Sequence, residues 1–246
     1  MKKSIVTLFL ICVTASAWAA DLPKQGFGVQ IGWAQPILRV NSPSSNPKDS
    51  LTSTLALKGF KVGVVYDASL IKGFGTSLGI NYTLAGNSTA WQQKNTVSIY
   101  PQQRTKTLYQ ELEVFVDWQY KFEVAGETYL MLYTGPTIQC GLAFQSHTDE
   151  RDMYDNITPN TSVQTRYEQH TGYDSNNDLK RLNVTWGIGA GFQYKRYFLR
   201  GGYDFGLLNP YANKQFYNSD GSIKDHYTRG RLDQWSIKIG AYLWYK

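Results

Sequence analysis

The chain has 246 residues and a formal net charge of +6 at pH 7, and aromatic side chains (18 Tyr, 11 Phe and 7 Trp) make up 15% of it. The positive excess is too small to indicate nucleic-acid binding. There are only two cysteines, and one of them, Cys12, lies in an N-terminal apolar run. The rest of the chain therefore has no pair of cysteines that could form an internal disulfide.

Residues 1–20 have the features of a secretory signal peptide. Lys2 and Lys3 precede an apolar core at 5–13, and Ala17-Trp18-Ala19 forms an A-x-A cleavage motif. The apolar run is much shorter than the ~20 residues that a membrane-spanning helix needs, which argues against a transmembrane anchor. We therefore expect a mature domain at 21–246 with a charge of about +4, because the two lysines are lost from +6.

Eight stretches after residue 25 alternate apolar and polar side chains. In the clearest one, Leu182, Val184 and Trp186 share one parity, and Asn183 and Thr185 share the other. Side chains of a β-strand point to opposite faces with a period of two, so each stretch has an apolar and a polar face. Strands of soluble sheets usually have about five or six residues, whereas a tilted crossing of a bilayer takes about 9–11 or more. The predicted strands are 26–38, 55–69, 76–90, 108–121, 128–144, 181–195, 197–208 and 232–246.

The connections between these stretches alternate between short and long. Short periplasmic turns opposite long external loops are typical of outer-membrane barrels, and an even strand number places both termini in the periplasm. The sequence therefore predicts an all-β fold, an eight-stranded antiparallel transmembrane β-barrel that is integral to the outer membrane. The short joints are 70–75, 122–127 and 195–197, and the long ones are 39–54, 91–107, 145–180 and 209–231.

Parity assigns the apolar side chains to the lipid face. Aromatic residues gather near both ends of this face, as in the belts that barrels form at the two membrane interfaces. Parity alone does not show which face points inward. The alternative is a soluble barrel with its apolar face inside, around an apolar ligand. Strand length and aromatic banding favour the membrane barrel. The aromatic belt is predicted from Trp33, Tyr66, Trp118, Tyr120, Tyr194, Tyr197, Trp235 and Tyr245, and the same face includes Cys140 and Phe144.

The opposite parity carries charged side chains. A Lys or Arg in the middle of the lipid face would cost roughly 2–4 kcal/mol, so these residues are expected to face the lumen. An eight-stranded barrel has an interior just wide enough for side chains to fill. We expect an internal network of ion pairs in place of an apolar core, with a conducting polar path as the alternative. Its predicted charged members are Lys61, Asp67, Glu111, Glu113, Asp117, Lys121, Arg200, Asp204 and Lys238.

Four segments between 108 and 209 carry strand motifs that can be compared with those of known barrel families. They are ELEVFVDWQYK at 111–121, YLMLYTGPTIQCGL at 129–142, WGIGAGFQ at 186–193 and RGGYDFGLLN at 200–209. The second resembles the GP-x-I-x-x-G strand of the PorT-like outer-membrane β-barrel proteins of Bacteroidetes, and the first resembles the strand before it. The last two resemble the last-but-one hairpin of that family, which ends in a Y-x-x-GL-x-N phrase. The chain departs from the family by ending in Trp244-Tyr245-Lys246, without a terminal Phe.

The resemblance implies a small barrel without enzymatic activity, and one branch of the family assists type IX secretion and gliding. Residues in this chain give no independent indication of an enzyme, a metal site or a cofactor. His147, His170 and His226 all fall in predicted external loops, and no histidine is expected on a strand that faces lipid. The alternative is an outer-leaflet enzyme that modifies lipid A, which would need a His with a Ser and an acid at the outer rim.

Gly187, Gly189 and Gly191 alternate along one strand with no helix after them. They therefore predict lumen space for large side chains such as Tyr133 rather than a phosphate-binding loop.

The predicted function is that of a non-enzymatic integral outer-membrane protein, structural or accessory to an envelope or secretion assembly. Its expected partners are outer-membrane lipid and lipopolysaccharide and another envelope protein, with no nucleic acid. The loop at 145–180 is the largest candidate for a specific contact, because loops of that length are usually functional or disordered.

Overall fold

The period-two segments of the sequence form the long strands of the structure. The computed structural model describes residues 25–42, 51–71, 73–93, 100–153, 168–171, 173, 179–211, 216–217, 223–224 and 229–246. The signal peptide expected at 1–20 lies outside the described residues. The long strands are β1 (Gln25–Ser42), β3 (Lys58–Ile71), β4 (Phe74–Ser88), β6 (Tyr100–Ala125), β7 (Thr128–Met153), β9 (Leu182–Tyr194), β10 (Tyr197–Gly206) and β13 (Arg229–Tyr245). The short strands are β2 (Leu51–Ala56), β5 (Gln92–Gln93), β8 (Glu168–Thr171), β11 (Phe216–Tyr217) and β12 (Ile223–Lys224).

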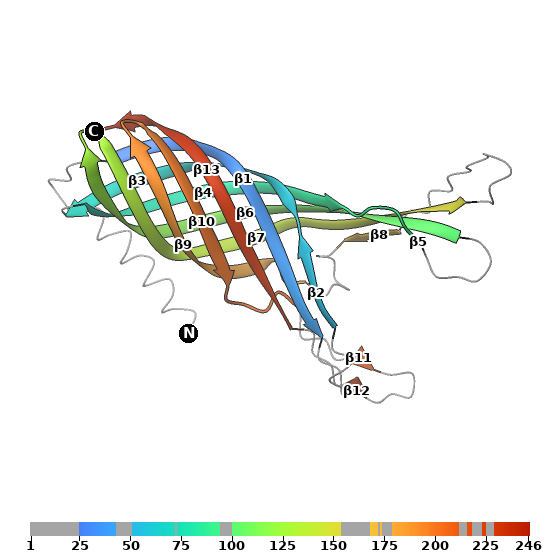
Figure 1. Ribbon diagram of the computed structural model, residues 1–246. Helices are drawn as coiled ribbons and strands as arrows, with labels where there is room; N and C mark the ends of the chain where they lie inside the picture. The colour runs from blue at the N-terminus through green and yellow to red at the C-terminus, as the bar shows by residue number, and fades with distance from the viewer. Residues whose placement is uncertain are drawn as a thin grey trace.

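Within the described ranges, the eight long strands close into an antiparallel ring in the order β1–β3–β4–β6–β7–β9–β10–β13 (Figure 1). The ring closes where β1 pairs with β13, from Gly26 opposite Tyr245 to Asn41 opposite Arg229. The short β2 also pairs with β1 and continues the line of β3 beyond Leu57. The predicted eight-stranded antiparallel barrel is confirmed.

Three tight turns lie at one end of the ring, which we call the turn end. Two residues separate β3 from β4, β6 from β7, and β9 from β10. Gly73, Gly126 and Lys195 in these turns have positive φ angles of 87°, 54° and 53°, as two-residue hairpin turns require. At the same end Gln25 and Lys246 exchange two backbone hydrogen bonds of 2.8 and 2.9 Å. Both ends of the described chain therefore lie beside the short turns.

The opposite end, which we call the loop end, differs from the prediction. β6 and β7 have 26 residues each, and their ladder runs past the ring as far as Tyr100 opposite Met153 (Figure 1). β5 pairs with the outer part of β6, and β8 pairs with that of β7. Parts of the loops expected at 91–107 and 145–180 are therefore strands. Both faces of this extension are polar, so the sequence carries no period-two contrast that would reveal it.

Along most strands, the side chains that point inward and outward are those that the predicted parity assigns to each face. In β7, a bulge reverses this parity. Glu111 pairs with Gly141 while Gln110 pairs with Ala143, so Leu142 has no partner on β6. Phe144 therefore lies opposite Tyr109, and the two rings meet edge to face with centroids 6.1 Å apart. Because Tyr109 is buried inside the ring, the prediction that Phe144 faces lipid is wrong.

A second bulge reverses the parity at the end of β13. Gly28 pairs with Tyr242 and Phe27 with Trp244, which leaves Leu243 as the extra residue. Tyr245 consequently stacks on Tyr242, with ring centroids 5.2 Å apart and an interplanar angle of 22°. The outward assignment of Tyr245 to the aromatic belt is wrong, and Trp244 takes the exposed position beside Phe27.

Candidate functional site

The lumen is the first candidate site, because most of the charged side chains predicted to face it are buried there. Lys61, Asp67, Glu111, Glu113, Asp117, Arg200 and Lys238 are at most 7% exposed, and so is the side chain of Lys121. Asp204 is half-buried. These four basic and five acidic groups form two networks, and the charge of Lys238 interacts with charged groups of both.

The first network is centred on Arg200 of β10, nearer the turn end. Its Nη2 donates to both carboxylate oxygens of Asp67 at 3.0 and 2.9 Å and to Gln119 at 3.0 Å, and its Nη1 donates to Ser77 at 2.8 Å. Asp67 also accepts hydrogen bonds from Lys121, at 3.1 Å, and from the Tyr242 hydroxyl. The network thus ties β10 to β3, β4, β6 and β13 across the interior.

The second network is centred on Lys61 of β3. Its Nζ lies 2.8 and 2.7 Å from the two carboxylate oxygens of Glu113 and also donates to Gln234. Gln234 in turn donates to Glu111, which accepts a 2.6 Å hydrogen bond from the Tyr109 hydroxyl. The amides that complete this network are Gln30, Asn81, Gln139 and Asn183.

Lys238 connects the two networks electrostatically. Its Nζ lies 5.2 Å from the centroid of the Phe115 ring, and the charges that act on it are those of Lys61, Asp117, Asp204 and Arg200. The guanidinium of Arg200 lies 5.6 Å from the ring centroid of Tyr133. A Cβ added to Gly189 would lie 2.2 Å from that ring. Gly189 therefore leaves the lumen space that Tyr133 occupies.

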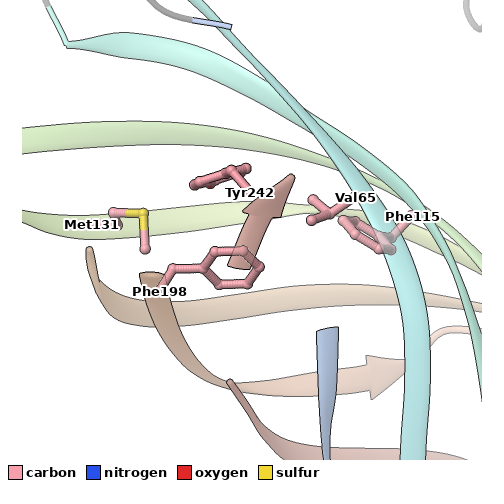
Figure 2. Close-up of a cluster of buried hydrophobic side chains, with 5 residues drawn as sticks. All are labelled: Val65, Phe115, Met131, Phe198 and Tyr242. Carbon is pink, nitrogen blue, oxygen red and sulfur yellow. The ribbon is translucent and has the colours of Figure 1, made fainter. Parts of the chain in front are cut away.

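Apolar side chains fill the lumen around the polar networks. Val65, Phe115, Met131, Phe198 and Tyr242, which project inward from different strands, form a buried cluster that interleaves with the network around Arg200 (Figure 2). Toward the loop end, a second buried cluster contains Leu57, Ala85 and Tyr109, and Leu55, Phe144, Tyr173 and Leu232 pack against it. The cavity at that end measures only about 20 Å³, which is room for about one water molecule.

Tyr173, which belongs to the predicted loop at 145–180, reaches into this outer cluster. Its ring lies edge-on to Phe144 at 6.4 Å, and Arg181 covers it at 5.2 Å from the ring centroid. A Cβ added to Gly141 would lie 2.0 Å from the Tyr173 hydroxyl, so a larger residue there would displace this ring. Burial and the charge of Glu111 raise the pKa of the Tyr173 hydroxyl above its ordinary value. No pattern in the sequence indicates that this tyrosine packs into the barrel.

The remaining residues of the predicted aromatic belt lie on the outer surface of the ring. Trp33, Tyr120, Tyr194 and Tyr197 are exposed, and Tyr66, Trp118 and Trp235 are half-buried there. The predicted lipid face also exposes Cys140. Trp118 contacts Trp186 of β9, which the belt prediction missed, with ring centroids 5.8 Å apart.

The outer face of the β6–β7 extension carries a charged cluster that sequence reasoning did not find. Asp149 accepts hydrogen bonds from Arg104 at 2.8 Å and lies 2.9 Å from Lys106 and 3.1 Å from His147 Nε2. The hydrogen bonds from Arg104 and Lys106 lower the pKa of the Asp149 carboxyl to about 2. The expectation that His147 lies in an external loop is wrong, because β7 continues past residue 144 and includes it.

The part of the chain that the structure describes contains no group of three or more His, Cys, Asp or Glu side chains arranged to hold a metal ion. None of its described helices is both long enough and apolar enough to span a bilayer.

Comparison with known proteins identifies the family. The family described as outer membrane protein beta-barrel domain matches residues 26–211. Among solved structures, the chain is similar to Ail, the attachment invasion locus protein of Yersinia pestis, crystallised with the heparin analogue sucrose octasulfate. The two share 11% identity over 89% of this chain and 97% of Ail, with a TM-score of 0.39.

Neisserial surface protein A is similar at 11% identity over 89% of this chain and 99% of its own, with a TM-score of 0.32. The N-terminal barrel domain of Pseudomonas aeruginosa OprF is similar at 10% identity over 84% and 96%, with a TM-score of 0.26. No curated protein sequence matches. The family match spans most of the ring, so the chain belongs to the outer membrane proteins with this beta-barrel domain.

Proposed function

We propose that this protein is a non-enzymatic outer-membrane scaffold with a sealed lumen, whose loop end faces the exterior and contacts another envelope component. The observation that carries this proposal is the filled interior. Two ion-pair networks occupy the lumen, one buried apolar cluster packs beside the Arg200 network, and a second lies toward the loop end. A solute could pass only if buried ion pairs broke, and breaking such a pair costs about 3–5 kcal/mol.

The orientation rests on the asymmetry of the two ends. The turn end has three two-residue turns and both termini of the described chain, which is the arrangement that barrels of this class present to the periplasm. The loop end would then face the exterior, and the β5–β6–β7–β8 extension would project from the membrane surface (Figure 1).

This extension is the part of the molecule best suited to hold a partner. Its ladder outside the ring is held by regular pairing and by the charged cluster around Asp149. Backbone pairing makes an ordered surface that a partner can meet without a large ordering cost. An accessory role in an envelope or secretion assembly, as in one branch of the PorT-like proteins that the sequence resembles, would use such a surface.

Conductance in a planar lipid bilayer tests the sealed lumen. The refolded barrel should insert without current steps, whereas a sixteen-stranded porin under the same conditions gives large ones. Steady ion conduction by the intact barrel would overturn the scaffold proposal.

Crosslinking in intact cells tests the contact surface. A photoreactive amino acid would replace the half-buried Thr105 on the extension, with the exposed Val124 at the turn end as the comparison position. Reproducible protein adducts at 105 and none at 124 are expected. Adducts at 124 alone would place the contacts at the turn end and contradict the proposal.

The pair of His147 and Asp149 favours a second candidate, an enzyme that modifies lipid A at the outer leaflet. The pair lies on the outer face of β7, where such a substrate would arrive. However, Arg104 and Lys106 also engage Asp149, so its carboxylate is shared with two cations. The test is the lipid A mass spectrum of cells with the protein, without it and with His147→Ala. Identical masses in all three would eliminate the enzyme.

A further inference from the structure

Two clusters that each hold one aspartate beside two permanent cations lie on the outer surface at the loop end. In one, Asp233 lies 3.0 Å from Arg39 Nε and 2.8 Å from Arg231 Nε. In the other, Asp149 lies 2.8 Å from Arg104 and 2.9 Å from Lys106. Each cluster therefore places two permanent cations on one carboxylate and keeps one positive charge in excess.

The carboxylates are covered and the cations are not. The side chains of Asp233 and Asp149 are 0% and 8% exposed, whereas those of Arg39, Arg231 and Lys106 are 46–50% exposed and that of Arg104 is 31% exposed. The Tyr203 hydroxyl and the Gly206 amide also donate to Asp233, at 2.9 Å each. Each buried acid thus fixes its cations in a defined position while they face outward.

Both clusters lie just beyond the apolar outer surface. Lys106 lies two residues before the exposed Leu108 on the same face of β6, about 7 Å farther toward the loop end. Arg231 and Asp233 lie four and two residues before Trp235 on the same face of β13, toward the loop end. Arg231 pairs with Arg39 across the β1–β13 ladder. In an outer-membrane barrel this is the height of the lipid head groups.

The clusters also lie far apart around the ring. In either direction, two further strands separate the β1–β13 cluster from the β6–β7 cluster. The exposed Lys58 lies between them, two residues beyond Phe60 on the outward face of β3. We name Arg39, Lys58, Arg104, Lys106 and Arg231 the cationic collar. The collar has five positive charges, and the two negative charges of Asp149 and Asp233 leave it with a net charge of +3.

We infer that the cationic collar binds the phosphate groups of a phosphorylated glycolipid in the outer leaflet, with at least one lipid at each of its two clusters. Guanidinium groups bind phosphate oxygens in a bidentate manner, and a charge-assisted hydrogen bond is about twice as strong as a neutral one. The exposed Leu108 and the half-buried Trp235 beside the cations would contact the acyl chains of the same lipid. This inference rests on the orientation in the proposed function.

Native mass spectrometry of the full-length refolded barrel tests the collar. The protein would be released from mixed micelles that contain phosphatidylethanolamine and bisphosphorylated lipid A. Parallel samples would contain dephosphorylated lipid A, or bisphosphorylated lipid A with excess inorganic phosphate. Retention of two or more bisphosphorylated lipids, little retention of the dephosphorylated form and no displacement by inorganic phosphate are expected. Equal retention of both lipids would overturn the inference, and displacement by inorganic phosphate would show a free-anion site instead.

Charge variants decide which end of the barrel binds. Arg104→Gln with Lys106→Gln should weaken retention about tenfold at one cluster, because hydrogen bonds to charged groups are lost. Arg196→Gln with Lys246→Gln removes the same charge at the turn end and should leave retention unchanged. Equal losses in both would mean non-specific attraction and would contradict the collar.

The second cluster needs a milder change, since Asp233 is buried. Arg39→Lys with Arg231→Lys keeps its charge but removes the bidentate geometry, and retention should fall at that cluster while the fold is kept. Unchanged retention in this variant would contradict a role for the two guanidinium groups. Loss of crosslinks at residue 105 with normal lipid retention would instead be a failure of the scaffold proposal alone.

Discussion

Arg200 and Asp67 form an ion pair across the lumen, although two strands of the ring separate β10 from β3. The guanidinium Nη2 lies 3.0 and 2.9 Å from the two carboxylate oxygens, and both side chains are buried. Pairing of neighbouring strands stabilises the wall of the barrel, whereas this pair connects opposite parts of the wall. Its loss should therefore weaken the whole ring.

Arg200→Met should lower the free energy of unfolding by about 3–5 kcal/mol, because it leaves the Asp67 carboxylate buried without its main partner. Arg200→Met with Asp67→Leu should cost less than Arg200→Met alone, because no buried charge is then left unpaired. Urea titration of the barrel in lipid vesicles, followed by mobility on a cold denaturing gel, measures both. Lys195→Gln at the exposed turn is the control. A double variant less stable than Arg200→Met would contradict the central role of this pair.

Tyr173 should hold the loop end of the barrel closed. Gly141→Val places a side chain where the Tyr173 hydroxyl lies, so it should expel the ring as effectively as Tyr173→Ala removes it. Both variants should raise amide hydrogen exchange in residues 141–146, whereas Tyr173→Phe keeps the contact with Phe144 and should change it little. Equal exchange in Tyr173→Ala and the parent chain would show that the contact does not order this end.

The bulge at Leu243 predicts opposite environments for two adjacent aromatic residues. Trp244 faces outward beside Phe27, and Tyr245 stacks on Tyr242. In a variant whose only tryptophan is Trp244, lipids brominated near the head group should quench the fluorescence strongly. When Tyr245→Trp supplies the only tryptophan and Trp244 is replaced by Phe, quenching should be weak. Weak quenching of Trp244 and strong quenching of the tryptophan at 245 would contradict the bulge, because a strand without a bulge places residue 245 on the outside.

These results show which parts of the barrel can be read from its sequence. Period-two alternation, strand length and alternating joints predict the ring, since the hydrocarbon layer imposes them on every crossing. Lys61 and Arg200 could be assigned to the interior for the same reason. Phe144 and Tyr245 could not be placed correctly, because one extra residue reverses a strand's parity and leaves no mark in composition.

The candidate sites were less predictable than the wall. Outside the hydrocarbon layer both faces of a strand are polar, so His147 and Arg104 read as loop residues. Their cluster forms only because the register of the extension pairs Arg104 with Asp149 and Lys106 with His147. Tyr173 reaches Gly141 through a tertiary contact that no local pattern encodes.

The cluster around Asp149 should make the extension sensitive to acid in a defined range. The Asp149 pKa of about 2 lies below the ordinary value of about 4 for an aspartate in an unfolded chain. Its contribution to the stability of the extension is therefore complete above about pH 4 and is lost as the pH falls toward 2. A carbon NMR titration of the labelled carboxyl group should give a midpoint near 2 in the parent chain. Removing the donors with Arg104→Gln and Lys106→Gln should return the midpoint toward 4, and a parent midpoint near 4 would mean that these cations do not hold the carboxylate.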